Sequence, residues 1–135
     1  MAYEYSMRFL MNMLKLSKLS KTWIIDLDGT IFPHNDYMKE KVETPLDGVK
    51  DFFERISERD FVIILTSRKS DYRKQTERNL LNTGIRYDIL IMDAPTGERI
   101  LINDLKPSGM VTAYSVCLKR DEGLSKLFFT ESDEI

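Results

Sequence analysis

The chain has 135 residues, a net charge of −2, 42% hydrophobic residues and 31% charged residues, as expected for one globular domain. The weak negative charge offers no basic field for nucleic acid or an anionic membrane. The only cysteine, Cys117, and the only histidine exclude an internal disulfide and a Cys/His zinc site. No apolar run approaches the roughly 18 residues of a membrane-spanning helix. We therefore expect a cytoplasmic protein without a membrane or nucleic acid partner.

The first 21 residues differ in composition from the rest of the chain. They are rich in Met, Leu, Ser and Lys, and Lys15 and Lys18 interrupt any signal-peptide apolar core. We interpret residues 1–21 as an N-terminal extension and residues 22–135 as the folded domain. A presequence-like or partner-binding amphipathic helix in the extension is the alternative interpretation.

From residue 22, apolar runs alternate with helical patterns, which indicates an α/β fold with a parallel sheet. The first predicted strand is Trp23–Leu27. Pro45 and Asp47 open a helix in which apolar residues recur at the spacing of one helical face: Val49, Phe52, Phe53 and Ile56.

The second predicted strand, Phe61–Leu65, is followed by a helix that starts at Ser70 or Asp71 and stops before Gly84. Three further strands are predicted in chain order: Ile89–Met92, Ile100–Ile102 and Val111–Leu118. Turn residues separate them, and the charged segment 119–135 is ambiguous.

Three of these strands end in oxygen-bearing side chains. Asp26 and Asp28 follow the first strand, Thr66 and Ser67 the second, and Asp104 the fourth. In an open parallel sheet, ligands bind outside the carboxyl ends of the strands, so these residues are expected to meet in one crevice.

The residue types in this crevice suit phosphoryl transfer. A strand-end carboxylate such as Asp26 can act as the nucleophile toward phosphorus, and Asp28 lies on the same side of an extended backbone and can protonate the leaving oxygen. Asp26 and Asp104 offer the oxygen ligands that Mg²⁺ prefers. Thr66 and Ser67 can donate to phosphate oxygens, with the following helix directing its N-terminus at the same place.

Two alternative interpretations of the Asp26 segment are weaker. A calcium-binding loop requires glycine at its sixth position and glutamate at its twelfth, where counting from Asp26 gives Ile31 and Tyr37. A simple Asp-Gly turn after a strand accounts for neither Thr66 nor Asp104.

The motifs resemble those of the haloacid dehalogenase (HAD) superfamily over about residues 22–109. The segment DLDGT at 26–30 resembles its first motif, FVIILTSR at 61–68 its second and ILIND at 100–104 its fourth. The resemblance implies a three-layer α/β/α Rossmann-like core with strand order 5-4-1-2-3 and a phosphoaspartate intermediate. It also implies Mg²⁺ held by Asp26, the backbone carbonyl of Asp28, and Asp104. The YD after Gly84 and the KPSG at 106–109 are similar to small members linked to sugar-phosphate or polysaccharide metabolism.

The chain departs from this family in one respect. The superfamily normally places a lysine or arginine after the third strand, but this chain has Asp93-Ala94-Pro95 there. Arg99 is the preferred substitute, and Arg68, Lys74 and Lys106 are the alternatives. Arg68 and Arg99 are therefore expected to bind phosphate together with Thr66 and Ser67.

The spacing of the motifs leaves no room for a cap domain. A capless site suits a phosphate on a larger molecule, or a partner subunit or second copy that covers it, and a phosphorylated small molecule is the other expected substrate. The sequence thus predicts a magnesium-dependent phosphomonoester hydrolase. The alternative is a catalytically weak or inactive HAD-like binding or regulatory subunit. A receiver domain is disfavoured because its acceptor aspartate follows the third strand.

Overall fold

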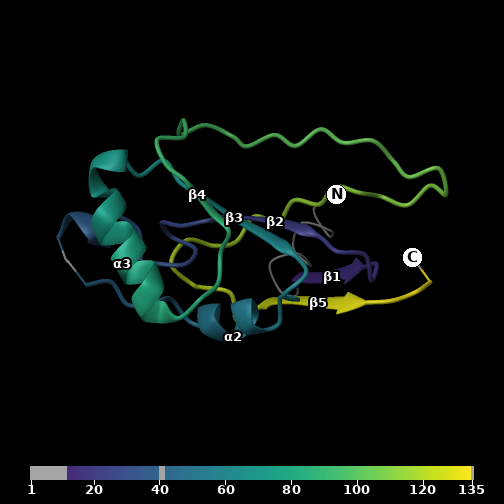
Figure 1. Ribbon diagram of the computed structural model, residues 1–135, viewed down its shortest axis with the longest axis horizontal. Coiled ribbons are helices and arrows are strands. Elements are labelled where there is room, and N and C mark those ends of the chain that lie inside the picture. The colour runs from purple at the N-terminus through teal and green to yellow at the C-terminus, as the bar shows by residue number, and fades with distance from the viewer. Residues whose placement is uncertain (1–11, 40–41, 135) are drawn as a thin grey trace.

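The computed structural model describes residues 12–39 and 42–134 of this α/β protein (Figure 1). The described residues form two α-helices, α2 (Val49–Glu54) and α3 (Arg73–Thr83), two 3-10 turns, η1 (Asp36–Met38) and η2 (Ser70–Tyr72), and five strands. No helix in the described residues is long and apolar enough to cross a membrane.

The site rests on a three-stranded sheet. Strands β2 (Thr22–Asp26), β3 (Phe61–Leu65) and β4 (Ile89–Ile91) lie in the order β2-β3-β4, and both pairs are parallel. In the register Ile25 pairs with Ile64, which in turn pairs with Leu90, and all three side chains are buried. The first three predicted strands and their adjacency are therefore confirmed, with bounds that differ by at most one residue.

The helices cover the buried face of this sheet. The apolar stripe predicted before the second strand is buried in α2 and the residues after it, at Val49, Phe52, Phe53 and Ile56. Leu80 of α3 is fully buried in the same core, and Gly84 ends α3 with φ +74°. The predicted helix after the second strand is thus formed by η2 and α3 together.

A second, two-stranded sheet joins the two ends of the described chain. Strand β1 (Asn12–Leu16) pairs in parallel with β5 (Leu127–Glu131), and Leu16 and Leu127 are buried. The ring of Phe129 in β5 lies 5.0 Å from that of Trp23 and 5.7 Å from that of Phe52. Residues 12–16 of the predicted extension therefore pack on the domain as a strand, whereas residues 1–11 lie outside the described residues.

The predicted strand order 5-4-1-2-3 is wrong for this structure, because residues 100–102 and 111–118 form no strand. The segment 95–116, here called the arm, leaves the sheet beyond β4, and Ile100 and Ile102 are 82% and 90% exposed (Figure 1). A parallel crossover needs a connection of about a dozen residues or more. Residues 92–99 are too few to carry the chain from β4 across β3 and β2. The structure has an α/β fold with parallel sheets, and the three-layer core implied by the resemblance is not confirmed.

Candidate functional site

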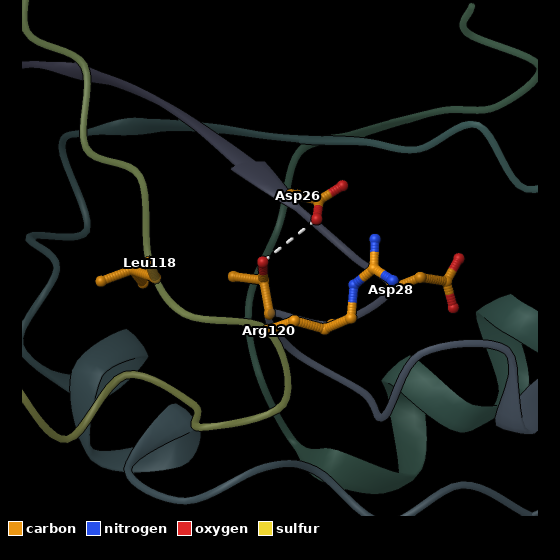
Figure 2. Close-up of a pocket in the computed structure, with 6 residues that line it drawn as sticks. Asp26, Asp28, Leu118 and Arg120 are labelled. Carbon is orange, nitrogen blue, oxygen red and sulfur yellow. Dashed lines mark hydrogen bonds between the residues drawn. The ribbon is translucent and has the colours of Figure 1, made fainter. Parts of the chain in front are cut away.

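Asp26 stands where β2 ends, and neighbouring groups hold both of its carboxylate oxygens. Arg99 Nη1 donates to Asp26 Oδ1 at 2.9 Å. Thr30 Oγ1 donates to Asp26 Oδ2 at 3.1 Å, the bond drawn as a dashed line in Figure 2. The chain then turns sharply, since the amides of Thr30, Ile31 and Phe32 all donate to the Leu27 carbonyl. Gly29 permits this turn with φ +86°. The predicted nucleophile is thus a partly exposed carboxylate with a fixed orientation.

Asp28 is held more tightly than Asp26. Arg68 donates from Nη2 to Asp28 Oδ1 at 2.6 Å and from Nε to Asp28 Oδ2 at 3.3 Å. Thr66 Oγ1 also donates to Asp28 Oδ2 at 3.3 Å. The strand-end groups of β2 and β3 therefore meet, as the sequence pattern predicts for a parallel sheet.

Arg68 is the centre of a buried polar network. Its side chain is fully buried, and Glu43, also fully buried, accepts Nη2 at 2.9 Å and Nη1 at 3.1 Å. Nη1 also donates to Thr76 Oγ1 at 2.9 Å, and the guanidinium lies 4.0 Å from the ring centre of Tyr37. All five N–H donors of Arg68 are engaged. The predicted phosphate contact of Arg68 would require one of these bonds to open.

Burial and charge act in opposite directions within this network. Burial raises the pKa of Glu43, and the hydrogen bonds from Arg68 oppose that shift. Burial lowers the pKa of Arg68, but the bonds to Asp28 and Glu43 outweigh it and leave the pKa above its ordinary value. Arg68 therefore remains a cation that pairs with two carboxylates at once.

The two hydroxyl groups predicted to bind phosphate are engaged within the protein. Thr66 is 1% exposed, and its Oγ1 accepts the Arg68 amide at 3.0 Å in addition to donating to Asp28. Ser67 Oγ donates to the Pro95 carbonyl at 3.0 Å. Both hydroxyl groups thus have internal partners and would have to exchange them for a phosphate oxygen.

Asp93 occupies the place where the sequence lacks the usual cation. Its backbone is left-handed, with φ +63°, and its Oδ1 accepts the amide of Ser70 at 3.0 Å. The hydrogen bonds from Ser70 lower the pKa of Asp93. This residue therefore joins the end of β4 to the start of η2, and the nearby positive charge comes from Arg99 instead.

A pocket of about 200 Å³ lies over the carboxylates. It is lined by Asp26, Asp28, Gly29, Thr30, Leu118 and Arg120 (Figure 2). The sequence pattern did not single out Arg120 or Glu43. Arg120 lies in the charged segment 119–135, whose structure the sequence leaves ambiguous, and Glu43 lies in the irregular loop between η1 and α2. For Glu43 a signal existed in principle, since an arginine three residues after a buried strand needs a carboxylate partner if it is buried too.

The carboxylate predicted as the third metal ligand is not at this pocket. Asp104 lies in the arm, where its carbonyl accepts the hydroxyl of Thr112. Among the residues that the structure describes, no three His, Cys, Asp or Glu side chains form a group able to hold a metal. Mg²⁺ often takes only one or two carboxylates, with waters and phosphate oxygens. The oxygens of Asp26 and Asp28 fit that donor chemistry, and Asp104 does not join them in this arrangement.

Comparisons with known proteins identify no family for the chain. No family model matches it, and neither does any curated protein. Among solved structures, it is similar to a chain in the structure of a Pnkp1/Rnl/Hen1 complex, with 30% identity and a TM-score of 0.48. That similarity covers 62% of this chain and 31% of the other, so the chain spans about a third of that protein. At this TM-score the similarity bears on neither fold nor function.

Proposed function

We propose that the chain is a magnesium-dependent, HAD-like phosphohydrolase that cleaves phosphomonoesters through a phosphoaspartate at Asp26. One observation carries the proposal. A strand-end carboxylate, half-exposed and oriented by Arg99 and Thr30, faces a pocket that a second carboxylate, Asp28, also lines. This arrangement supports nucleophilic attack by one group and proton transfer by the other.

The reaction divides into two steps. In the first, an oxygen of Asp26 bonds to phosphorus while the bond to the leaving oxygen breaks, and Asp28, which must take a proton from solvent before this step, gives that proton to the leaving oxygen. In the second, Asp28 takes a proton from the water that attacks phosphorus, the Asp26–phosphorus bond breaks, and phosphate leaves. Arg99, hydrogen-bonded to Asp26 Oδ1, supplies positive charge beside the reacting group throughout.

The Asp26 carboxylate and the Asp28 backbone carbonyl would hold Mg²⁺ at this pocket. The ion, when bound, would neutralise the charge of the carboxylate and the phosphate. Arg68 contributes from behind, because its two bonds to Asp28 fix the direction of that side chain relative to Asp26.

The substrate is a sugar phosphate or a phosphate carried on a larger molecule. The pocket is small, and the described residues between the motifs form no separate cap domain. A partner subunit or a second copy could complete the cover during catalysis.

Hydrolysis of para-nitrophenyl phosphate with Mg²⁺ tests the proposal, followed by a panel of sugar phosphates. We expect turnover that Asp26→Asn abolishes and that Asp51→Asn, an exposed change on α2, leaves intact. Turnover equal in the wild type and Asp26→Asn would refute the nucleophile.

A second candidate function is a non-catalytic, HAD-like binding or regulatory subunit. The observation in its favour is that Asp26 is already ion-paired with Arg99, while Asp104 is absent from the pocket lining. Phosphate binding without turnover across the substrate panel would favour this function over the first.

A further inference from the structure

We propose that Arg120 is the residue that binds the anionic phosphate oxygens of the ligand at this pocket. The inference rests on the proposed phosphate chemistry of the site but not on its turnover. It assigns a binding role to a residue from the C-terminal part of the chain, far in sequence from the motifs around Asp26 and Thr66.

The segment that carries Arg120 is docked on the loop after Asp26. The amide of Asp121 donates to the Gly29 carbonyl at 2.9 Å, and the amide of His34 donates to Asp121 Oδ1 at 2.8 Å. Asp121 makes both bonds, one with the turn at Gly29 and one with the loop that follows it, and they fix the backbone beside Arg120. Backbone contacts of the neighbouring residue therefore fix the position of Arg120 over the pocket.

The side chain of Arg120 lies across Gly29. A Cβ atom added to Gly29 would lie 3.1 Å from Arg120 Cγ and 3.8 Å from its Nε, so the missing side chain makes room for the arginine stem. Figure 2 shows the Arg120 side chain extending across the pocket from the segment that also carries Leu118. The stem is thus packed, while the guanidinium faces the space beside the carboxylates.

Among the described residues that line the pocket, Arg120 is the one cation. Arg99 is paired with Asp26, and Arg68 is saturated by Asp28, Glu43 and Thr76. With the described residues, the guanidinium of Arg120 forms neither an ion pair nor a hydrogen bond. An arginine fork of this kind suits two oxygens of a phosphate, which it binds with parallel hydrogen bonds.

The test uses three variants of the full chain. Arg120→Ala removes the guanidinium, Arg120→Lys keeps the charge without the fork, and Arg59→Ala removes an exposed arginine next to the start of β3, at the opposite end of the sheet. Thermal unfolding of each variant checks that the fold is retained. Calorimetric titration with inorganic phosphate in the presence of Mg²⁺ then measures binding without requiring turnover.

We expect Arg120→Ala to weaken phosphate binding about tenfold or more, Arg120→Lys to lose less, and Arg59→Ala to match the wild type. With a turned-over substrate, Arg120→Ala should raise KM by a similar factor and change kcat less. Phosphate binding that depends on Arg120, with no turnover by the wild type or any variant, would support the inference and overturn the proposed phosphohydrolase activity. Unchanged phosphate affinity in Arg120→Ala, or no phosphate binding by the wild type, would overturn the inference.

Discussion

Replacing Glu43 with glutamine tests how much the buried network around Arg68 stabilises the fold. Glu43 accepts two bonds from Arg68 and one from Asn79 Nδ2 at 3.3 Å, and its side chain is fully buried. Glutamine keeps one acceptor oxygen but turns an N–H₂ group toward a donor. Breaking a buried ion pair from one side costs about 3–5 kcal/mol. Because Asp28 still neutralises Arg68, we expect the lower end, about 3 kcal/mol.

Glu77→Gln is the matched control for this experiment. Glu77 pairs with Arg73 at 3.1 Å, but the two side chains are 47% and 42% exposed, so its loss should cost less than about 0.5 kcal/mol. Urea unfolding followed by circular dichroism measures both changes, and Glu43→Gln should also lower Tm by roughly 10 °C. A cost for Glu43→Gln no larger than that for Glu77→Gln would refute the stabilising role of the network.

Three further predictions concern single residues. Burial, and then the charge of Asp28, raise the pKa of Tyr37 in the folded protein. Tyrosine in the unfolded chain ionises first, at about pH 10, so the free energy of unfolding should fall as pH rises above that value. Tyr37→Phe should flatten that fall in urea titrations from pH 8 to 11, and an unchanged slope would contradict it. Gly123→Ala should cost well over 2 kcal/mol, because its Cβ would lie 2.1 Å from the Asp47 carbonyl oxygen. Gly84→Ala, with open space and a similar φ, should cost only about 1–2 kcal/mol; equal costs in thermal unfolding would refute the steric reasoning. Asp60→Ala should cost about 1–3 kcal/mol, because the Trp23 indole donates to Asp60 at 2.9 Å, and tryptophan fluorescence should report the loosened ring.

The parts of the fold that could be predicted are those with a strong local pattern. The strand Phe61–Leu65 and the helical stripe from Val49 are continuous apolar signals, and the structure has both. The apolar run at Ile100–Ile102 looked equally strand-like, but pairing depends on whether the connection can reach a partner. The pairing of β1 with β5 depends on contacts between segments more than a hundred residues apart, which no local period encodes.

The candidate site divides in the same way. Asp26, Asp28 and Thr66 follow strands that form as predicted, so the meeting of these groups was predictable. Arg99 was the preferred replacement for the missing cation, and the structure places it against Asp26, although its role toward phosphate stays a prediction. Glu43 and Arg120 could not be predicted because each lies in a loop, and the sequence pattern does not predict the path by which these loops reach the site.

The pairing of β1 with β5 has a consequence for synthesis in the cell. During translation, Leu16 and its neighbours leave the ribosome long before Leu127 exists to shield them. Closing so long a loop is entropically costly, and contacts of this separation form slowly. Strand β1 therefore stays without its partner until residues 127–131 have been synthesised, and an unpaired strand of this kind is the exposed surface from which aggregation starts.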